Sequence, residues 1–156
     1  LLELSSGSFG AGQTIPVAHA GKGVGENRSP ALAWRGLPSE TEELVLIIED
    51  ADAPLPRPFV HMIATGIDPN LPGLPEAAFN PPASIHAVLG RNSFGKTAYA
   101  GPRALPGHGP HRYSFQLLAL NGKLHFDKPP TLPEVLAQLD RSVLARGRLD
   151  GIFERI

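Results

Sequence analysis

The chain has 156 residues, of which 42% are hydrophobic and 19% are charged, and its formal net charge is −1. This length and balance are typical of a single folded domain over residues 1–156, and they exclude wholesale disorder. The near-neutral charge argues against a nucleic-acid partner, and no apolar run approaches the ~20 residues of a transmembrane segment.

Cysteine is absent, whereas glycine and proline each occur 17 times. The lack of cysteine excludes disulfide scaffolds, thiolate nucleophiles and cysteine-ligated zinc, and it fits the cytoplasm. The first residue is Leu1 rather than Met. A removed signal peptide, and with it a periplasmic or secreted location, therefore stays open. Glycine and proline between apolar runs are typical of a β-rich fold with long shaped loops.

Four segments are predicted to be strands. Glu43–Ile48 is an apolar run typical of a strand that is buried on both faces, and Val60–Thr65 and Ala83–Gly90 follow as further candidates. The fourth segment alternates, and one of its faces carries Tyr113, Phe115, Leu117 and Ala119. Asn121-Gly122 then predicts a hairpin turn.

A helix is predicted near the C-terminus. Thr131 and Glu134 have the spacing of a capping box, and Pro133 falls in the first turn. An apolar stripe follows at helical spacing, at Leu132, Val135, Leu136, Leu139 and Val143. The Arg-Gly-Arg sequence of residues 146–148 suits the negative end of the helix dipole and an exit from the helix. These elements predict a mostly antiparallel β architecture with a C-terminal helix on its flank.

The junction EDADAPLPRPFVH, residues 49–61, carries the first group of candidate site residues. Asp50 and Asp52 come at the end of a hydrophobic strand, and His61 stands where the next strand begins. Taken alone, such aspartates are typical turn caps, which bond nearby backbone N–H groups. A second junction that also carries a histidine favours a binding site, because functional groups concentrate on loops that a rigid sheet positions.

That second junction is GHGPHRY, residues 107–113. His111 and Tyr113 are two residues apart, so an extended chain projects both side chains to the same face and Arg112 to the other. We expect Arg112 to form a bidentate bond with Asp50 or Asp52 and to tie the two junctions together.

Together, the junctions resemble the two signature regions of the phosphatidylethanolamine-binding protein family, and in particular its bacterial, Raf kinase inhibitor-like branch. The first signature stands here as Asp50-Ala51-Asp52-Ala53-Pro54 with His61 after a short loop, and the second as Gly101-Pro102 with His111-Arg112-Tyr113. Three further segments are similar to the family, namely Glu26–Trp34, Gly90–Pro102 and Ala145–Arg155. The resemblance therefore spans nearly the whole chain.

The resemblance implies a large central antiparallel sheet packed on a smaller sheet, with short helices. It also implies a small surface pocket for anions such as phosphate or a phospholipid (phosphoethanolamine) head group. Carried over by position, the pocket residues are Asp50, Asp52, Pro54, His61, Gly101, Pro102, His111 and Tyr113. The Ala53–Pro54 peptide bond is expected to be cis. We expect a non-enzymatic protein without cofactor or metal, and a homodimer.

Backbone amides near Gly101, the two imidazoles and the Tyr113 hydroxyl are the donors that a phosphate needs. The carboxylates are unexpected at an anion site. We expect Asp50 to hold one imidazole as a charged donor and to raise its pKa, or to meet the amine of an ethanolamine group. The chain departs from the family at Ala51, which replaces a proline. It also departs at Phe59, Val60 and Met62, which replace tryptophans and predict a less aromatic pocket wall.

Two other function classes stay open. In the first, His61, His111 and Asp50 form a metal site or an acid–base group of a hydrolase. In the second, the protein inhibits a kinase or protease, and the proline-rich segment Asp68–Pro82 is the candidate contact surface.

Overall fold

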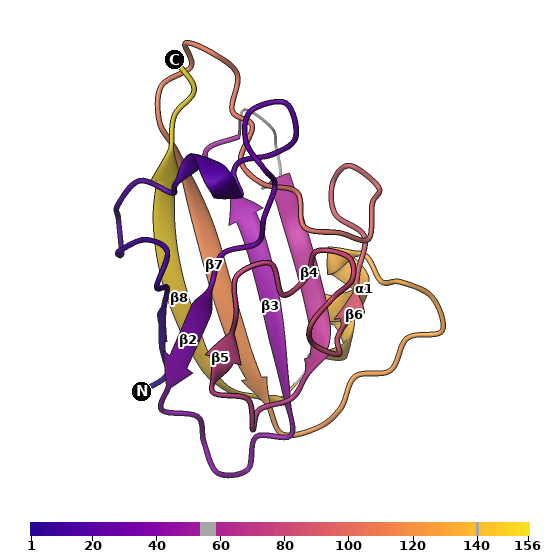
Figure 1. Ribbon diagram of the computed structural model, residues 1–156. Coiled ribbons are helices and arrows are strands. Elements are labelled where there is room, and N and C mark those ends of the chain that lie inside the picture. Colours follow the sequence, from indigo (N-terminus) through magenta and orange to yellow (C-terminus); the bar gives the residue numbers. More distant parts are fainter. Residues whose placement is uncertain (54–58, 140) are drawn as a thin grey trace.

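The computed structural model describes residues 1–53, 59–139 and 141–156, which fold around two antiparallel sheets (Figure 1). The large sheet has the strand order β6-β4-β3-β7-β8, and the small sheet has the order β1-β2-β5. The large-sheet strands are β3 (Glu43–Asp50), β4 (Phe59–Ile67), β6 (Val88–Leu89), β7 (His111–Leu120) and β8 (Val143–Phe153). The small-sheet strands are β1 (Glu3–Ser5), β2 (Leu32–Arg35) and β5 (Gly73–Leu74). A 3-10 helix, η1 (Val17–His19), and one α-helix, α1 (Leu132–Gln138), complete the described elements.

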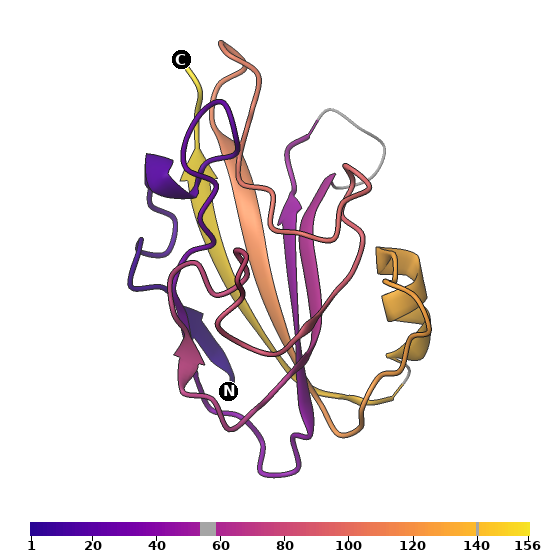
Figure 2. The same ribbon diagram turned by 45° about the vertical axis from the view of Figure 1, so that its right-hand side comes forward.

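The molecule has three layers. The small sheet lies on one face of the large sheet and α1 lies on the other (Figures 1 and 2). Leu46 of β3 belongs to the core between the sheets, whereas Val45 and Ile47 pack with Val135 of α1 in a second core. β3 is therefore buried on both faces, as its apolar run predicts. Each fully buried side chain of this size contributes about 1.5–3 kcal/mol. The mostly β architecture with a C-terminal helix is confirmed.

Strand register brings the two predicted junctions together. On β3, Asp50 pairs with Phe59 of β4 on one side and with Tyr113 of β7 on the other. The end of β3 and the beginnings of β4 and β7 therefore meet at one end of the large sheet. The predicted alternation of β7 is also confirmed, because Tyr113 and Phe115 are buried between the sheets while Arg112 is exposed.

The predicted helix begins as expected but ends early. The Thr131 hydroxyl accepts the backbone N–H of Glu134, and the Glu134 carboxylate accepts the N–H of Thr131, so the capping box is formed. The continuation of the helix beyond Gln138 is wrong, as is the helix-end role of residues 146–148, since these residues belong to β8. Arg141 has a left-handed backbone (φ 52°), which is incompatible with an α-helix, and the chain then enters the ladder beside β7.

The hairpin predicted at Asn121-Gly122 is also wrong. β7 pairs with β8, which the chain reaches only after α1, and the N–H of Asn121 donates to the carbonyl oxygen of Ser142 (2.9 Å). The local turn signal gives way because β8, rather than residues 123–130, supplies the hydrogen-bond partners of β7.

The remaining differences concern lengths and loops. Of the strand predicted at Ala83–Gly90, only β6 forms, whereas β3 and β4 are longer than predicted. The segment Asp68–Pro82, considered as a contact surface, contains β5 and buries Ala78 and Phe79 in the core. Among the described residues, no helix is long and apolar enough to cross a bilayer.

Candidate functional site

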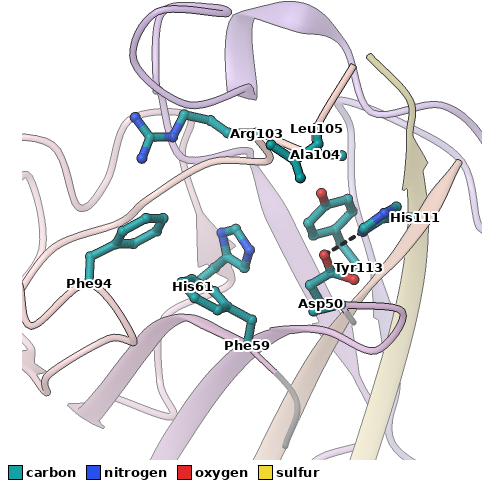
Figure 3. Close-up of a pocket in the computed structure, with 10 residues that line it drawn as sticks. Asp50, Phe59, His61, Phe94, Arg103, Ala104, Leu105, His111 and Tyr113 are labelled. Carbon is teal, nitrogen blue, oxygen red and sulfur yellow. Dashed lines mark hydrogen bonds and ion pairs between the residues drawn. The ribbon is translucent and has the colours of Figure 1, made fainter. Parts of the chain in front are cut away.

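A cavity of about 280 Å³ opens at the end of the large sheet where β3, β4 and β7 meet (Figure 3). Four of the residues predicted from the sequence line it, namely Asp50, His61, His111 and Tyr113. The other lining residues are Ala53, Phe59, Phe94, Arg103, Ala104 and Leu105.

Asp50 and His111 form a buried pair. The Nδ1–H of His111 donates to Oδ2 of Asp50 at 2.7 Å, and both side chains are less than one tenth exposed (Figure 3). The second carboxylate oxygen of Asp50 accepts the backbone N–H of Asp52 at 2.9 Å. Both oxygens of Asp50 are therefore engaged within the protein, and the ring of His111 keeps Nε2 for a further partner. The hydrogen bond that we expected between Asp50 and one imidazole is therefore present, while the charged-donor role stays a prediction.

His61 is fixed by the backbone of the neighbouring loop. Its Nδ1–H donates to the carbonyl oxygen of Ala100 at 2.6 Å, and its own carbonyl oxygen accepts the N–H of Ala100 at 3.1 Å. Burial lowers the pKa of His61 below the ordinary value of a histidine. The ring is therefore neutral at pH 7, with Nε2 as a hydrogen-bond acceptor, and in the free protein His61 is not a charged donor.

A β-bulge sets the direction of His61. On β4, Val60 pairs with Glu49 and Met62 pairs with Ile48, so His61 is the extra residue between two consecutive partners on β3. Val60 faces the core beneath α1, whereas His61 lines the cavity. Bulges re-aim side chains in this way and are frequent beside functional sites.

Tyr113 places its ring edge-on to His61, with ring centroids 5.3 Å apart. Its hydroxyl points toward Ala104 (Figure 3). Burial raises the pKa of the Tyr113 phenol well above its ordinary value. The side chain is therefore a neutral O–H group, able to donate to an anion without ionising.

Arg103 supplies a positive charge that the sequence interpretation missed. Its guanidinium carbon lies 5.0 Å from the ring centroid of Phe94, in a cation–π contact. One N–H donates to the carbonyl oxygen of Lys22 at 3.3 Å, and within the described residues Arg103 forms no ion pair. Its position directly after the Gly101-Pro102 signature could have identified Arg103 as a site residue from the sequence.

Asp52 is not among the described residues that line the cavity. Its Oδ2 accepts the backbone N–H of Arg112 at 2.7 Å, and its Oδ1 lies 3.7 Å from the Arg112 guanidinium. Arg112 thus joins the two junctions as predicted, but through one long contact to Asp52 and not through a bidentate bond. Both side chains are largely exposed, so this ion pair stabilises the fold by less than ~1 kcal/mol.

Gly101 and Pro102 are likewise not among the described residues that line this cavity. The N–H of Gly101 donates to Oδ1 of Asn27 at 2.7 Å, and the Pro102 carbonyl oxygen accepts the N–H of Gly21 at 2.9 Å. The amide of Gly101 is therefore already engaged within the protein, while the donor role that we predicted for backbone amides near Gly101 stays a prediction. Pro54 and the predicted cis bond before it lie outside the described residues.

Two phenyl rings form an aromatic wall despite the missing tryptophans. Phe59 and Phe94 meet edge to face at 4.8 Å, and Phe59 lies 5.4 Å from the ring of His61. The sequence interpretation considered only the residues flanking His61 and missed Phe94, which comes from a different loop.

The metal-site alternative has no support from the geometry. Within the part of the chain that the structure describes, no group of three or more His, Asp or Glu side chains is placed to hold a metal ion. The Oδ2 of Asp50 is instead bonded to His111.

Comparison with known proteins gives the family. Residues 5–154 match the family model described as phosphatidylethanolamine-binding protein. Over 153 residues the chain is 35% identical to a UPF0098 protein of Pyrococcus horikoshii, an alignment that covers 96% of this chain and 75% of the relative.

Two solved structures agree in fold. Escherichia coli YbcL, a member of the mammalian PEBP family, superposes with a TM-score of 0.91 at 26% identity, and the match covers 99% of both chains. CT736 of Chlamydia trachomatis, a putative PEBP homolog, superposes with a TM-score of 0.88 at 31% identity, covering 99% of this chain and 98% of that one. As the sequence resemblance predicted, the chain belongs to the phosphatidylethanolamine-binding protein family.

Proposed function

We propose that the chain is a non-enzymatic binding protein whose cavity takes a phosphate-class anion, either free or as a phospholipid head group. One observation carries the proposal. A single solvent-accessible cavity combines the cation of Arg103, the neutral hydroxyl of Tyr113 and the imidazoles of His61 and His111. Cations and neutral O–H or N–H donors are the groups that bind phosphate oxygens.

The carboxylate of Asp50 is compatible with this proposal. Each of its two oxygens already accepts one hydrogen bond, from His111 or from the backbone of Asp52, and these bonds offset part of its negative charge. Arg103, which lines the same cavity, adds a positive charge to it. His61 contributes in either of two ways: Nε2 accepts the O–H of a singly protonated phosphate, or it takes up a proton when the anion binds.

A phosphoethanolamine head group adds an amine to the phosphate. The description of the matching family names phosphatidylethanolamine. In this chain, Asp50 is the carboxylate that lines the described part of the cavity, so it is the residue we assign to the amine. Inorganic phosphate and phosphoethanolamine therefore test two parts of the same proposal.

The test is a titration followed by NMR amide shifts and calorimetry. Inorganic phosphate and O-phosphoethanolamine are expected to shift the amides of Ala53, His61, Ala104 and His111, and ethanolamine alone is expected to bind more weakly than O-phosphoethanolamine. Arg103→Gln is expected to weaken both phosphate compounds about five- to tenfold, since a charged hydrogen bond in an open site contributes about 1–1.5 kcal/mol.

Arg146→Gln is the matched control, because it removes the same charge from an exposed position on β8 that does not line the cavity. Equal losses in the two variants would show that binding follows net charge and not this site. Titration without shifts at the cavity would overturn the proposal.

The inhibitor alternative, the homodimer and the cytoplasmic location stay predictions. Light scattering coupled to size-exclusion chromatography tests the dimer. Inhibition assays against kinases and proteases test the inhibitor alternative. Deletion of Asp68–Pro82 is unsuited to that purpose, because it would remove β5 and two core side chains.

A further inference from the structure

A second cavity, of about 380 Å³, adjoins the first and shares Phe94 and Arg103 with it. Lys22 and Lys96 add two further cations to its lining. No carboxylate belongs to the lining within residues 1–53, 59–139 and 141–156. The chain as a whole carries a net charge of −1, so this concentration of positive charge is local.

The cations of this cavity are not neutralised by the protein. Across the described ranges, Lys22, Lys96 and Arg103 form no ion pair, whereas Arg28, for comparison, is paired with two glutamates. All three side chains belong to exposed residues, so their charges remain hydrated and available. Like charges that converge on one concave surface attract anions to it.

One wall of the cavity is fixed by Asn27. Its Nδ2–H donates to the carbonyl oxygen of Tyr99 at 3.1 Å, and its Oδ1 accepts the N–H of Gly101 at 2.7 Å. Asn27 has a left-handed backbone (φ 53°), which asparagine adopts more readily than most residues. The segment around Asn27 is thus locked to the segment 99–101.

Another part of the lining is fixed by Asn92 in the same manner. Its Nδ2–H donates to the carbonyl oxygen of Ala98 at 3.0 Å. Its Oδ1 accepts the backbone N–H groups of Phe94 at 2.9 Å and Lys96 at 3.0 Å. Asn92 itself is buried, so the loop that carries Lys96 is organised before any ligand arrives.

The interior of the cavity is largely apolar. Phe94, Ala98, Tyr99 and Ala100 line it, and the hydroxyl of Tyr99 is already bonded to the carbonyl oxygen of His19 at 2.7 Å. The cavity therefore offers rings and methyl groups inside and ammonium and guanidinium groups on exposed residues. A mostly apolar lining with a few polar groups is typical of small-molecule sites.

We propose that this second cavity binds an organic anion that has an aromatic or apolar body, such as an aryl phosphate or an aryl carboxylate. Lys22, Lys96 and Arg103 hold the anionic group, and the rings of Phe94 and Tyr99 contact the body. The proposal does not depend on the ligand of the first cavity, because three of the five residues named, Lys22, Lys96 and Tyr99, line the second cavity and not the first.

Phenyl phosphate, inorganic phosphate and benzyl alcohol are the probes for this site. Phenyl phosphate is expected to shift the amides of Lys22, Lys96, Ala98 and Gly101, and to bind at least tenfold more tightly there than either of the other two. The amides of Ala53 and His111, at the first cavity, report separately on that site.

Two variants test the assignment. The double variant Lys22→Gln/Lys96→Gln is expected to weaken phenyl phosphate about tenfold, whereas the same change at the chain's other two lysines, Lys123→Gln/Lys128→Gln, is expected to leave its affinity within twofold. Ala98→Leu fills the cavity without changing charge and is expected to block binding.

An unchanged amide spectrum of each variant away from its substitution establishes that the fold is intact. Equal losses in the two double variants, or shifts from phenyl phosphate at the first cavity alone, would overturn the proposal. Full binding by Ala98→Leu would do the same.

Discussion

Protonation of His61 is expected to couple anion binding to pH. Because Nδ1–H is donated to the carbonyl oxygen of Ala100, the proton is gained at Nε2, and burial lowers the pKa of this step in the free protein. An anion in the cavity stabilises the imidazolium and so raises the pKa of His61 in the complex. Binding therefore takes up a proton, and affinity increases as the pH falls.

The size of the effect follows from the geometry of the cavity. Two unit charges about 4 Å apart interact by about 4 kcal/mol at an effective dielectric constant of about 20. The cavity is open to solvent and also contains Asp50, so we expect about a third of this energy. That third, ~1.4 kcal/mol, corresponds to about a tenfold change in affinity. The gain accumulates as the pH falls through the pKa values of the complex and then of the free protein.

Sulfate is the appropriate probe, because its charge is constant over this range while that of a phosphate monoester changes near pH 6. Calorimetry between pH 7.5 and 5.0 gives the affinity. NMR of the imidazole rings with and without sulfate gives the pKa and the tautomer of His61. His61→Gln is expected to remove most of the pH dependence, and His111→Gln separates any contribution of the other ring.

Two results would refute the reasoning. A proton on Nε2 and none on Nδ1 in the neutral ring would contradict the hydrogen bond to Ala100 on which the argument rests. Sulfate that binds at the cavity with the same affinity from pH 7.5 to 5.0 would show that His61 takes up no proton on binding.

Three further predictions concern stability and selectivity. The pKa of His61 is lower in the folded than in the unfolded chain, so the unfolded chain binds more protons. The free energy of unfolding, measured by urea titration, should therefore decrease as the pH falls below about 6.5, by up to ~1.4 kcal/mol per pH unit. Asp50→Asn should lower the free energy of unfolding by about 1–3 kcal/mol, because the amide has one acceptor oxygen whereas the carboxylate accepts hydrogen bonds from both the His111 ring and a backbone N–H. If the amine lies at Asp50, the same variant should also strengthen the binding of inorganic phosphate and weaken the binding of phosphoethanolamine. Gly101→Ala should cost about 1–3 kcal/mol or more by thermal unfolding, since its Cβ would lie 2.0 Å from the carbonyl oxygen of His19.

Each of these has a matched control. His61→Gln should flatten the pH dependence of stability, and a slope that persists would assign it to other groups. Asp52→Asn, at an exposed carboxylate, should lower the free energy of unfolding by less than Asp50→Asn does. The reverse order would contradict the importance of the buried Asp50–His111 pair. Gly122→Ala meets no atom within 4 Å and should be nearly neutral, so a similar loss in both glycine variants would point to backbone freedom and not to the clash.

The local sequence pattern was enough to predict the elements whose own side chains fill the core. β3 places Leu44, Leu46 and Ile48 in the core between the sheets, and β7 places Tyr113, Phe115 and Leu117 there. The helix start is determined by the contacts of Thr131 with Glu134. These signals need no knowledge of the rest of the chain. The two loop-to-strand junctions were recognisable for the same reason, since each keeps its polar residues within a short segment.

β8 was missed because glycine occupies two of its inward positions. At Gly151, the place of a side chain is taken by Ile15 and Phe9, whose atoms lie 2.6 and 2.7 Å from where a Cβ would stand. At Gly147 the neighbour is Leu2, at 3.1 Å. The core on this face is filled from the N-terminal segment, so the alternation that marks a strand is absent from β8 itself, and the apolar stripe of α1 appeared to continue.

The direction of His61 depends on the whole sheet in a similar way. A regular β4 would alternate Val60, His61 and Met62 between the two faces, and a one-residue shift reverses every side chain. The bulge relieves this constraint, because His61 has no partner on β3 and its carbonyl oxygen and ring instead bond the backbone of Ala100. The loop that carries Arg103 is thereby anchored to β4 through the histidine itself. The sequence places a histidine at this junction, but only the register of β3 against β4 turns it toward the cavity.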